Sequence, residues 1–119
     1  MEMNMGIGIP ASEFSRHAGE ATRLLKVLAN EFRLLTLCHL SESGELSVSE
    51  LVDRVGLSQS ALSQHLARLR EEGLVATRKE AQTVFYRVCD PKAERLLALL
   101  HDLFCPELGN KGATGRKES

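Results

Sequence analysis

The chain has 119 residues, 43% of them hydrophobic and 26% charged, which fits one domain and leaves no room for a second, catalytic one. Its 15 basic and 16 acidic side chains give a formal net charge of −1, so any nucleic-acid binding has to depend on a local positive patch. No apolar run approaches the roughly 18 residues that a membrane span needs, and residues 1–10 lack a secretory signal, so we expect a cytoplasmic protein without a membrane partner. The three cysteines, an odd number, argue against a disulfide framework.

The two ends of the chain carry no periodic apolar pattern. Residues 1–11 are rich in methionine and glycine, and residues 107–119 are polar and glycine-rich. We therefore expect a disordered N-terminal arm and a disordered C-terminal tail. Residues 12–106 form the expected folded domain.

Two helices are predicted at the start of this domain. Apolar residues recur at helical spacing from about Ser12 to Ala29, which indicates a first helix. Asn30 is suited to the N-cap of a second helix, which reaches Leu40 and ends before Gly44. Because the second helix is apolar around much of its circumference, we expect it at the centre of the domain.

The next stretch predicts two short helices in close succession. Ser47, followed three residues later by Glu50, has the form of a capping box and begins a helix that ends at Gly56. Ser58 can cap the next helix, which we expect to continue to Glu72. Two helices joined by a three-residue turn are typical of the helix-turn-helix.

The types of residue change after Gly73. Residues 74–78 and 83–88 are rich in β-branched and aromatic side chains, and the polar residues 79–82 separate them, so they predict a β-hairpin. Asp90 followed by Pro91 begins a last helix, which Pro106 ends. The fold class is therefore mainly α with a β-hairpin wing, a winged helix-turn-helix of order α-α-α-α-β-β-α.

The helix from Ser58 to Glu72 has one apolar and one polar face. Leu62, Leu66 and Leu69 share one side at about 100° per residue, and His65 beside them fits a packing role. The polar side chains of its first turns can meet base edges in a DNA major groove, and they are Gln59, Ser60, Ser63 and Gln64. Taken alone, this pattern fits a solvated face better than a DNA contact.

Several cations could supply the local positive charge that phosphate contacts need. Arg68, Arg78 and Lys79 lie on the second helix of the motif and on the hairpin, although each also fits a solvated surface charge. For Arg70 and Arg87 we favour the solvated interpretation.

Two segments resemble a known family. Residues 56–66, Gly-Leu-Ser-Gln-Ser-Ala-Leu-Ser-Gln-His-Leu, with Leu69-Arg70 and Gly73-Leu74-Val75 after them, resemble the ArsR family of bacterial winged-helix repressors. Residues 28–34 are similar to that family's A-N/D-x-x-R-L motif at the start of its second helix. The resemblance covers about residues 18–104. Together with the wing, it favours DNA contact over a solvated face for the polar residues of the recognition helix.

The resemblance implies a homodimer whose first and last helices pack against their copies, and which represses by binding a near-palindromic operator in double-stranded DNA. Two recognition helices would then meet successive major grooves about 34 Å apart. The last helix independently favours a partner, because it has more apolar surface than one side of a small domain can bury. Its apolar residues include Leu96, Leu97, Leu99, Leu100, Leu103 and Phe104.

Two cysteines acquire a possible role from the same resemblance. Residues 79–86 together with Cys38 and Cys105 look like the subgroup that includes the BigR, SqrR and HlyU regulators, several of which sense sulfane sulfur or oxidants through two cysteines. The resemblance implies that a disulfide or polysulfide bridge between the two thiols lowers operator affinity. Without it, two buried structural cysteines would be the better interpretation. Cys89 has no recognised counterpart and is interpreted as incidental.

Other classes of function remain as alternatives. His101 and Cys105 share a helical face, so the histidine could activate the thiol, or Cys38, His101 and Cys105 could bind zinc or a metalloid. The lack of the family's other metal-binding motifs makes metal sensing the second choice, and we expect no cofactor. A small thiol enzyme is disfavoured because Cys38 and His39 point about 100° apart. A winged helix that binds only protein has no supporting feature.

Overall fold

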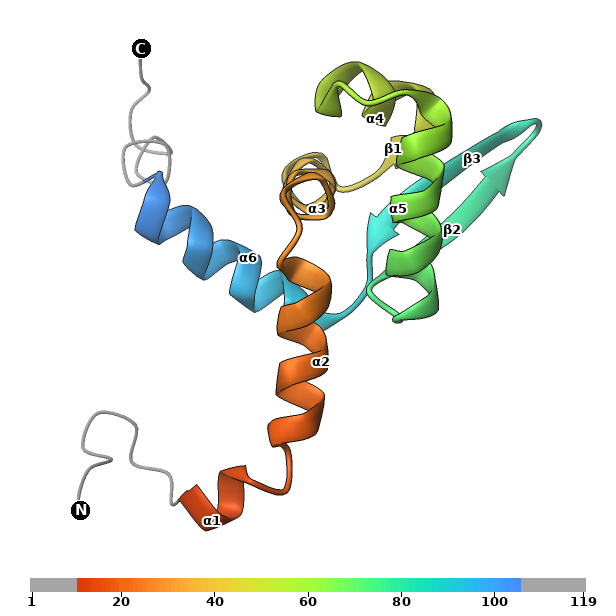
Figure 1. The fold of residues 1–119 in the computed structure, drawn as a ribbon. Helices are drawn as coiled ribbons and strands as arrows, with labels where there is room; N and C mark the ends of the chain where they lie inside the picture. The colour runs from red at the N-terminus through yellow and green to blue at the C-terminus, as the bar shows by residue number, and fades with distance from the viewer. Residues whose placement is uncertain (1–10, 106–119) are drawn as a thin grey trace.

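The structure is a computed structural model that describes residues 11–105, and it has the expected winged-helix architecture (Figure 1). The disordered arm and tail that we predicted lie outside the described residues, except that Ala11 begins the first helix. In chain order the elements are α1 (Ala11–Phe14), α2 (Ala18–Leu28), α3 (Glu31–Ser43), β1 (Leu46–Ser47), α4 (Val48–Val55), α5 (Gln59–Glu71), β2 (Val75–Glu80), β3 (Thr83–Val88) and α6 (Pro91–Phe104).

The predicted first helix is broken into α1 and α2. At the break, the backbone N–H groups of Arg16, His17 and Ala18 donate to carbonyls three residues earlier, not four. The Ser15 hydroxyl also donates to the Ser12 carbonyl, at 2.9 Å. The apolar spacing continues across this tight turn, so the periodicity gave no sign of it.

The junction between α2 and α3 is fixed by two side chains. The Asn30 side-chain oxygen accepts hydrogen bonds from the backbone N–H groups of Phe32 and Arg33, each at 3.0 Å, which confirms the predicted N-cap. Arg33 Nε donates to the Val27 carbonyl at 2.8 Å, which satisfies an acceptor at the end of α2. These bonds hold α2 and α3 at a defined angle.

The helix-turn-helix boundaries are those expected from the sequence. Ser47 and Glu50 form a complete capping box at the start of α4. Gly56 ends α4 in the left-handed conformation, with φ of 85°, which glycine adopts without strain. Ser58 Oγ then accepts a hydrogen bond from the Ala61 N–H and caps α5.

The sheet has three strands in the order β1-β3-β2, and the sequence had predicted only two of them. The short β1 pairs antiparallel with β3, placing Leu46 opposite Tyr86. The strands β2 and β3 form the wing, and their loop is shorter than predicted, with only Ala81 and Gln82 between the strands. Ala81 has φ of 56°, which a two-residue hairpin loop requires.

The core lies between α3 and the helix-turn-helix. Leu37 and Leu40 of α3 are completely buried, and α3 contacts α2, α4, α5, α6 and β3, so its predicted central position is confirmed. Leu62, Leu66 and Leu69 of α5 pack into the same core, which confirms the apolar face of that helix.

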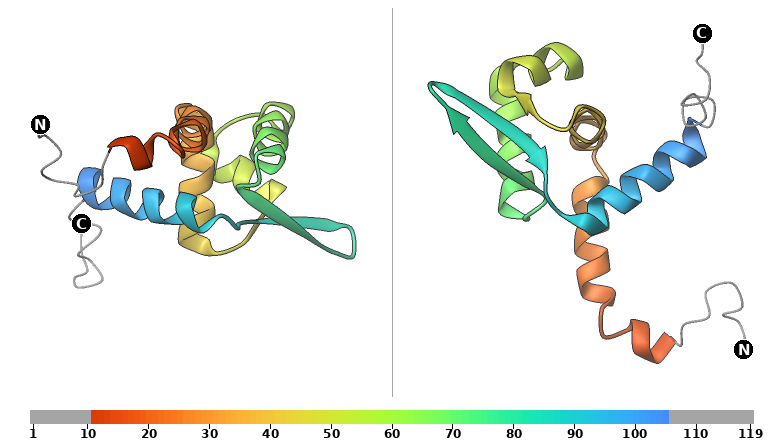
Figure 2. Two further views of the ribbon diagram at one scale, coloured as in Figure 1. Left: turned by 90° about the horizontal axis from the view of Figure 1, so that it is seen from below. Right: turned by 180° about the vertical axis from the view of Figure 1, so that it is seen from behind.

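Two parts of the chain extend from this body. Figures 1 and 2 show α2, with α1 at its end, and α6 diverging from the winged-helix core. Asp90 and Pro91 cap α6 as predicted. Within residues 11–105, no helix has the length and apolar character needed to cross a bilayer.

Candidate nucleic-acid interface and thiol pair

The polar face of α5 is open to solvent. Gln59, Ser60, Ser63 and Gln64 are all exposed, on the opposite side of the helix from its three buried leucines. Because the cap at Ser58 and the leucine face both fix α5, these four side chains are displayed from a rigid support. The structure therefore brings together the four residues that the sequence singled out for base contact.

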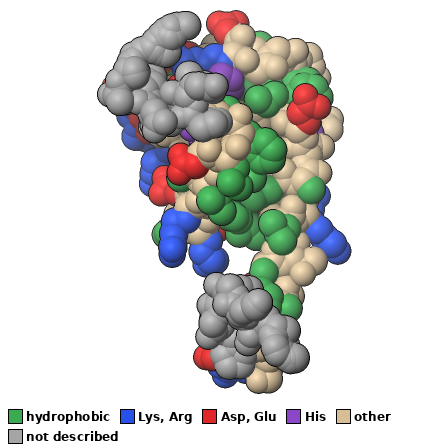
Figure 3. Space-filling view, turned by 90° about the vertical axis from the view of Figure 1, so that its left-hand side faces the viewer, with side chains coloured by type: hydrophobic (Ala, Val, Ile, Leu, Met, Phe, Trp, Pro, Cys, Tyr) green, Lys and Arg blue, Asp and Glu red, His purple; other side chains and the backbone are tan. Residues whose placement is uncertain are grey.

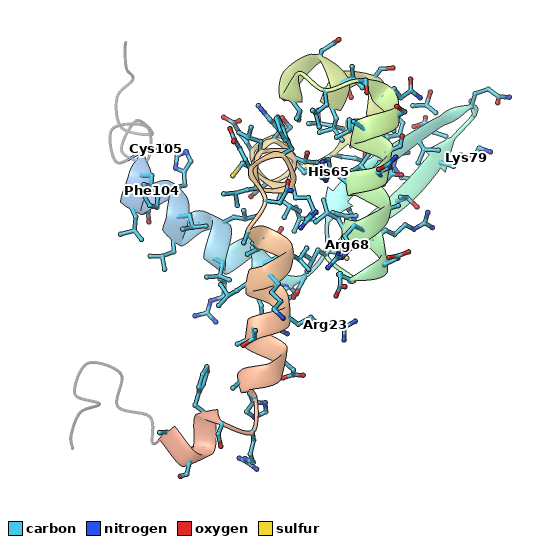
Figure 4. The ribbon with its side chains drawn as sticks, in the orientation of Figure 1. Arg23, His65, Arg68, Lys79, Phe104 and Cys105 are labelled. Atoms are coloured by element: carbon cyan, nitrogen blue, oxygen red, sulfur yellow. The ribbon has the colours of Figure 1, made fainter. Side chains whose placement is uncertain are left out.

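His65 extends from α5 toward α3 (Figure 4), where its ring stacks on Phe32 with the ring centroids 6.4 Å apart. Burial, followed by the positive charge of Arg33, lowers the pKa of the His65 imidazole. The protonated ring is therefore disfavoured, and the ring packs between two helices, as its position beside the leucine face predicted.

Glu72, at the end of α5, links two arginines from different helices. Its carboxylate accepts a hydrogen bond from Arg23 Nε of α2 at 2.8 Å, and it lies 3.4 Å from Arg68 Nε of α5. The hydrogen bond from Arg23 is the main cause that lowers the pKa of Glu72. Arg68, a predicted phosphate contact, is thus partly neutralised, and α5 is connected to α2. Figure 4 labels both arginines.

The two predicted cations of the wing differ in their surroundings. Lys79 is exposed on β2 toward the free end of the hairpin (Figure 4), with no hydrogen bond or ion pair within residues 11–105. Arg78 donates hydrogen bonds to both oxygens of Glu45 and to Glu80, at 2.7 to 3.0 Å. Its guanidinium carbon lies 4.6 Å from the centroid of the Phe85 ring. The sequence placed Arg78 on the wing but did not predict these partners.

Cys38 lies on the side of α3 that faces α6. It is half-buried and borders a groove of about 410 Å³ whose other walls include Glu42, Leu97, His101 and Asp102. Burial, then the nearby Cys105, then Glu42 raise the pKa of the Cys38 thiol. The contribution of Cys105 means that the two cysteines, although far apart in sequence, lie within electrostatic range of each other.

Cys105 is the residue that follows α6, and its backbone N–H donates to the His101 carbonyl at 2.7 Å. Both Cys38 and Cys105 are free thiols. Cys89 is also free but exposed, and its sulfur lies 3.5 Å from the Gly73 carbonyl at the base of the wing.

The predicted metal alternative has little geometric support. Cys38 and His101 border the same groove. Within residues 11–105, however, no group of three histidine, cysteine, aspartate or glutamate side chains is arranged to hold a metal ion. Cys38, His101 and Cys105 therefore do not form a three-ligand site in this chain.

The face formed by α1, α2 and α6 is apolar, and no other element within residues 11–105 covers it. Figure 3 shows hydrophobic side chains gathered into a patch on this side of the molecule. Phe14, Leu25, Leu99, Leu103 and Phe104 are between 51% and 77% exposed. A groove of about 830 Å³ lies between α2 and α6 on the same face. Side chains of this kind are seldom left in water over a large area.

Comparison with known proteins gives a consistent result. The sequence profile described as "Bacterial regulatory protein, arsR family" matches residues 30–77. The transcriptional activator HlyU of Vibrio cholerae serotype O1 is 52% identical over 100 residues, which cover 84% of this chain and 92% of that protein. The biofilm growth-associated repressor of Agrobacterium fabrum is 43% identical over 106 residues, covering 88% and 90%. The structure of reduced HlyU from Vibrio cholerae N16961 has a TM-score of 0.75 at 54% identity, covering 79% of this chain and 98% of that one.

Proposed function

Because the chain belongs to the arsR family of bacterial regulatory proteins, which are DNA-binding transcriptional regulators and not enzymes, we propose that it represses by occupying an operator and is released by a thiol switch. One observation carries the switch: Cys38 borders the groove between α3 and α6, and Cys105 directly follows α6. The nearby Cys105 also contributes to raising the pKa of the Cys38 thiol. Of the two relatives named above, one is called an activator and the other a repressor. That this chain represses, and does not activate, is therefore part of the proposal.

The base-contacting residues are Gln59, Ser60, Ser63 and Gln64, from the first turns of α5. Gln64 and Gln59 can each donate to and accept from an adenine, while the serines can reach either a base or a phosphate. Lys79 and Arg68 bind phosphates, and their contacts position the protein without selecting sequence. The exposure of these side chains supports the assignment.

The regulator acts as a homodimer through the uncovered face of α1, α2 and α6. The exposed leucines and phenylalanines of this face, together with the groove between α2 and α6, support this assembly. A two-fold dimer presents two α5 helices to a near-palindromic operator, with half-sites about one helical turn apart.

The switch begins when a persulfide donor transfers its sulfane sulfur to one thiolate of the pair and leaves as a thiolate. The thiolate of the second cysteine then attacks the Sγ atom of the modified cysteine. A disulfide forms, and the outer sulfur departs as hydrosulfide. If a further sulfane sulfur has been added first, the second thiolate attacks the sulfur next to the terminal one, hydrosulfide again departs, and the bridge is one atom longer. With peroxide, the first product is a sulfenic acid and the group that leaves is water.

A bridge between Cys38 and Cys105 ties α3 to the end of α6, at the edge of the face assigned to the dimer. The relative orientation of the two subunits then changes, and the two α5 helices no longer match the spacing of the half-sites. Operator affinity falls although no DNA-contacting side chain has been modified.

The DNA-contact assignment is tested with the reduced protein and the DNA upstream of its own gene. We expect Gln64→Ala to lose about 1–3 kcal/mol of discrimination at one base pair of each half-site. Lys79→Ala should weaken all sequences equally and reduce the salt slope by about 0.9 per contact. A Gln64→Ala protein with unchanged specificity would refute its base-contacting role.

The switch is tested by mass spectrometry after separate exposure to glutathione persulfide, peroxide and zinc. We expect persulfide or peroxide to link Cys38 to Cys105, with a mass that gives the number of bridging sulfur atoms. Modification of Cys89 alone, with Cys38 and Cys105 unchanged, would refute the proposed pair. Stoichiometric zinc that releases DNA would replace the thiol switch by metal sensing.

A further inference from the structure

We propose that Arg78 is a positioning residue that fixes the wing against the body of the domain, and that it is not one of the phosphate contacts. The inference rests on the proposed DNA contact of the wing, because positioning matters only if the wing meets DNA. Arg78 and its neighbour Lys79 on β2 therefore have different roles: Arg78 positions the wing, and Lys79 binds phosphate.

The first support is the number and direction of the hydrogen bonds. Arg78 Nε donates to Glu45 Oε2 at 3.0 Å and Nη2 donates to Glu45 Oε1 at 2.7 Å, which is the two-pronged arrangement of an arginine with a carboxylate. The remaining nitrogen, Nη1, donates to Glu80 Oε1 at 2.8 Å. All three guanidinium nitrogens therefore already have carboxylate acceptors.

The second support is where these partners lie in the sheet. Arg78 is on β2, and Glu45 immediately precedes β1, so the two residues come from opposite edges of the three-stranded sheet. The central strand β3 places Phe85 between them, paired with Arg78 on one side and with Ser47 on the other. The guanidinium crosses over the Phe85 ring, 4.6 Å from its centroid, to reach Glu45.

This arrangement constrains the wing in a way that the strand pairing alone does not. A two-stranded ribbon twists and bends easily, and β1 contributes only two residues to the sheet. The contact between Arg78 and Glu45 joins the outer strand to the segment that follows α3. It therefore sets the angle at which the hairpin leaves the body and hence the position of Lys79.

The charge balance also argues against phosphate binding by Arg78. Two carboxylates accept hydrogen bonds from the one Arg78 guanidinium, and Arg87, whose charge also acts on Glu45, makes no hydrogen bond to either carboxylate within residues 11–105. A DNA phosphate would have to displace a carboxylate from a paired guanidinium while approaching the other carboxylate. Lys79 carries no such neighbour among the hydrogen-bonded and ion-paired residues of the described chain.

The two roles predict opposite signs for one substitution. If Glu45 merely competed with a phosphate for Arg78, Glu45→Gln would free the cation and tighten operator binding. If Arg78 positions the wing, Glu45→Gln weakens binding, even though it makes the protein one unit more positive. Glu71→Gln, an exposed carboxylate at the end of α5, is the control for the change in net charge.

The experiment combines a measurement without DNA and one with DNA. In the free protein, we expect backbone amides at the end of the hairpin to exchange about fivefold faster in Glu45→Gln and Arg78→Ala. They should be unchanged in Arg70→Ala, which removes an exposed arginine from α5 and leaves the contact between Arg78 and Glu45 in place. Because no DNA is present, this result is independent of the proposed function.

In operator binding, we expect Glu45→Gln to lower affinity by about threefold or more and Glu71→Gln not to lower it. The double variant Glu45→Arg with Arg78→Glu, which reverses the pair at constant net charge, should recover most of the affinity that Arg78→Glu alone loses. Tighter binding by Glu45→Gln, or no recovery in the double variant, would overturn the proposal. Unchanged amide exchange in Glu45→Gln and Arg78→Ala would overturn it as well.

Discussion

Two regions of the molecule differ in how many of their contacts lie within this chain. One is the recognition helix α5 with the wing, and the other is the pair of helices α3 and α6. Around α5, the cap at Ser58, the buried leucines, the Phe32–His65 stack and the bond from Arg23 to Glu72 all come from the chain itself. The far end of α6, in contrast, carries Leu103 and Phe104 at 61% and 77% exposure. The side that we propose contacts DNA is held in place by contacts within this chain, whereas the side that carries the thiols leaves apolar residues exposed, which the proposed dimer would cover.

This difference suggests how control works. A side that is held in place by many contacts is poorly suited to change its shape, so in the proposed dimer we expect regulation to act on the separation of two such sides. Cys38 lies on α3 and Cys105 directly follows α6, so a new bond between them would join α3 to the end of α6 and alter that separation.

The largest effect should come from the uncovered face. Leu99 is 52% exposed in the single chain, so Leu99→Glu should leave the fold intact but place a charge in the dimer contact. We expect a monomer by light scattering and a loss of operator affinity of at least about 100-fold, because the two half-site contacts are no longer linked. Far-UV circular dichroism serves as the control for folding. A dimeric Leu99→Glu protein would contradict the assigned interface.

A smaller effect should come from the contact between the two sides. Arg23→Ala removes the hydrogen bond from α2 to Glu72, so the carboxylate is left with Arg68 as its remaining partner. We expect operator affinity to fall about two- to fivefold, as for the loss of an exposed ion pair. Lys26→Ala, which removes another exposed cation from α2, is the matched control and should have less effect.

The pKa of Cys38 offers a test with a defined sign. Burial and the nearby Cys105 and Glu42 raise this pKa, so the Cys38 thiolate is less populated at neutral pH than in an ordinary thiol. In a Cys89→Ser background, the alkylation rate of Cys38 should rise with pH, at higher pH than for a model thiol. Cys105→Ser should shift that profile to lower pH. An identical profile would mean that the two cysteines do not interact.

The smallest effect concerns the wing. Ala81 has φ of 56°, where glycine avoids the strain of a side chain, so Ala81→Gly should raise the free energy of unfolding by at most about 1 kcal/mol. Gln82→Gly, at the other loop position, should not raise it, because Gln82 does not have a positive φ. Thermal unfolding of the two variants gives the comparison.

Much of the fold followed from local signals in the sequence. The capping box at Ser47 and Glu50, the glycine at position 56 and the Asp90–Pro91 start of α6 depend on neighbouring residues, and all three are present in the structure. The strand β1 could not be predicted in the same way, because two residues carry no alternation and pair only with a distant strand. The wing loop was predicted too long because alanine at position 81 gives no turn signal.

The features of the candidate site also divide into those that local sequence predicts and those that depend on distant residues. The four polar residues of α5 could be predicted because helical spacing alone puts them on one face. The spacing of Arg68 and Glu72, four residues apart at the end of α5, also fits an ion pair. The bonds from Arg23 to Glu72 and from Arg78 to Glu45 could not be predicted, because each joins residues that are far apart in sequence. The sequence shows that an arginine is present, but only the tertiary contacts show whether a distant carboxylate forms an ion pair with it.

The central claim is that DNA contact and control are separate, and that control requires both Cys38 and Cys105. It is tested most directly by operator affinity before and after treatment with glutathione persulfide, in a Cys89→Ser background. We expect the treated protein to lose at least about tenfold in affinity, and Cys38→Ser and Cys105→Ser to keep theirs. If either single variant loses affinity on treatment as the parent does, the two-thiol switch is contradicted.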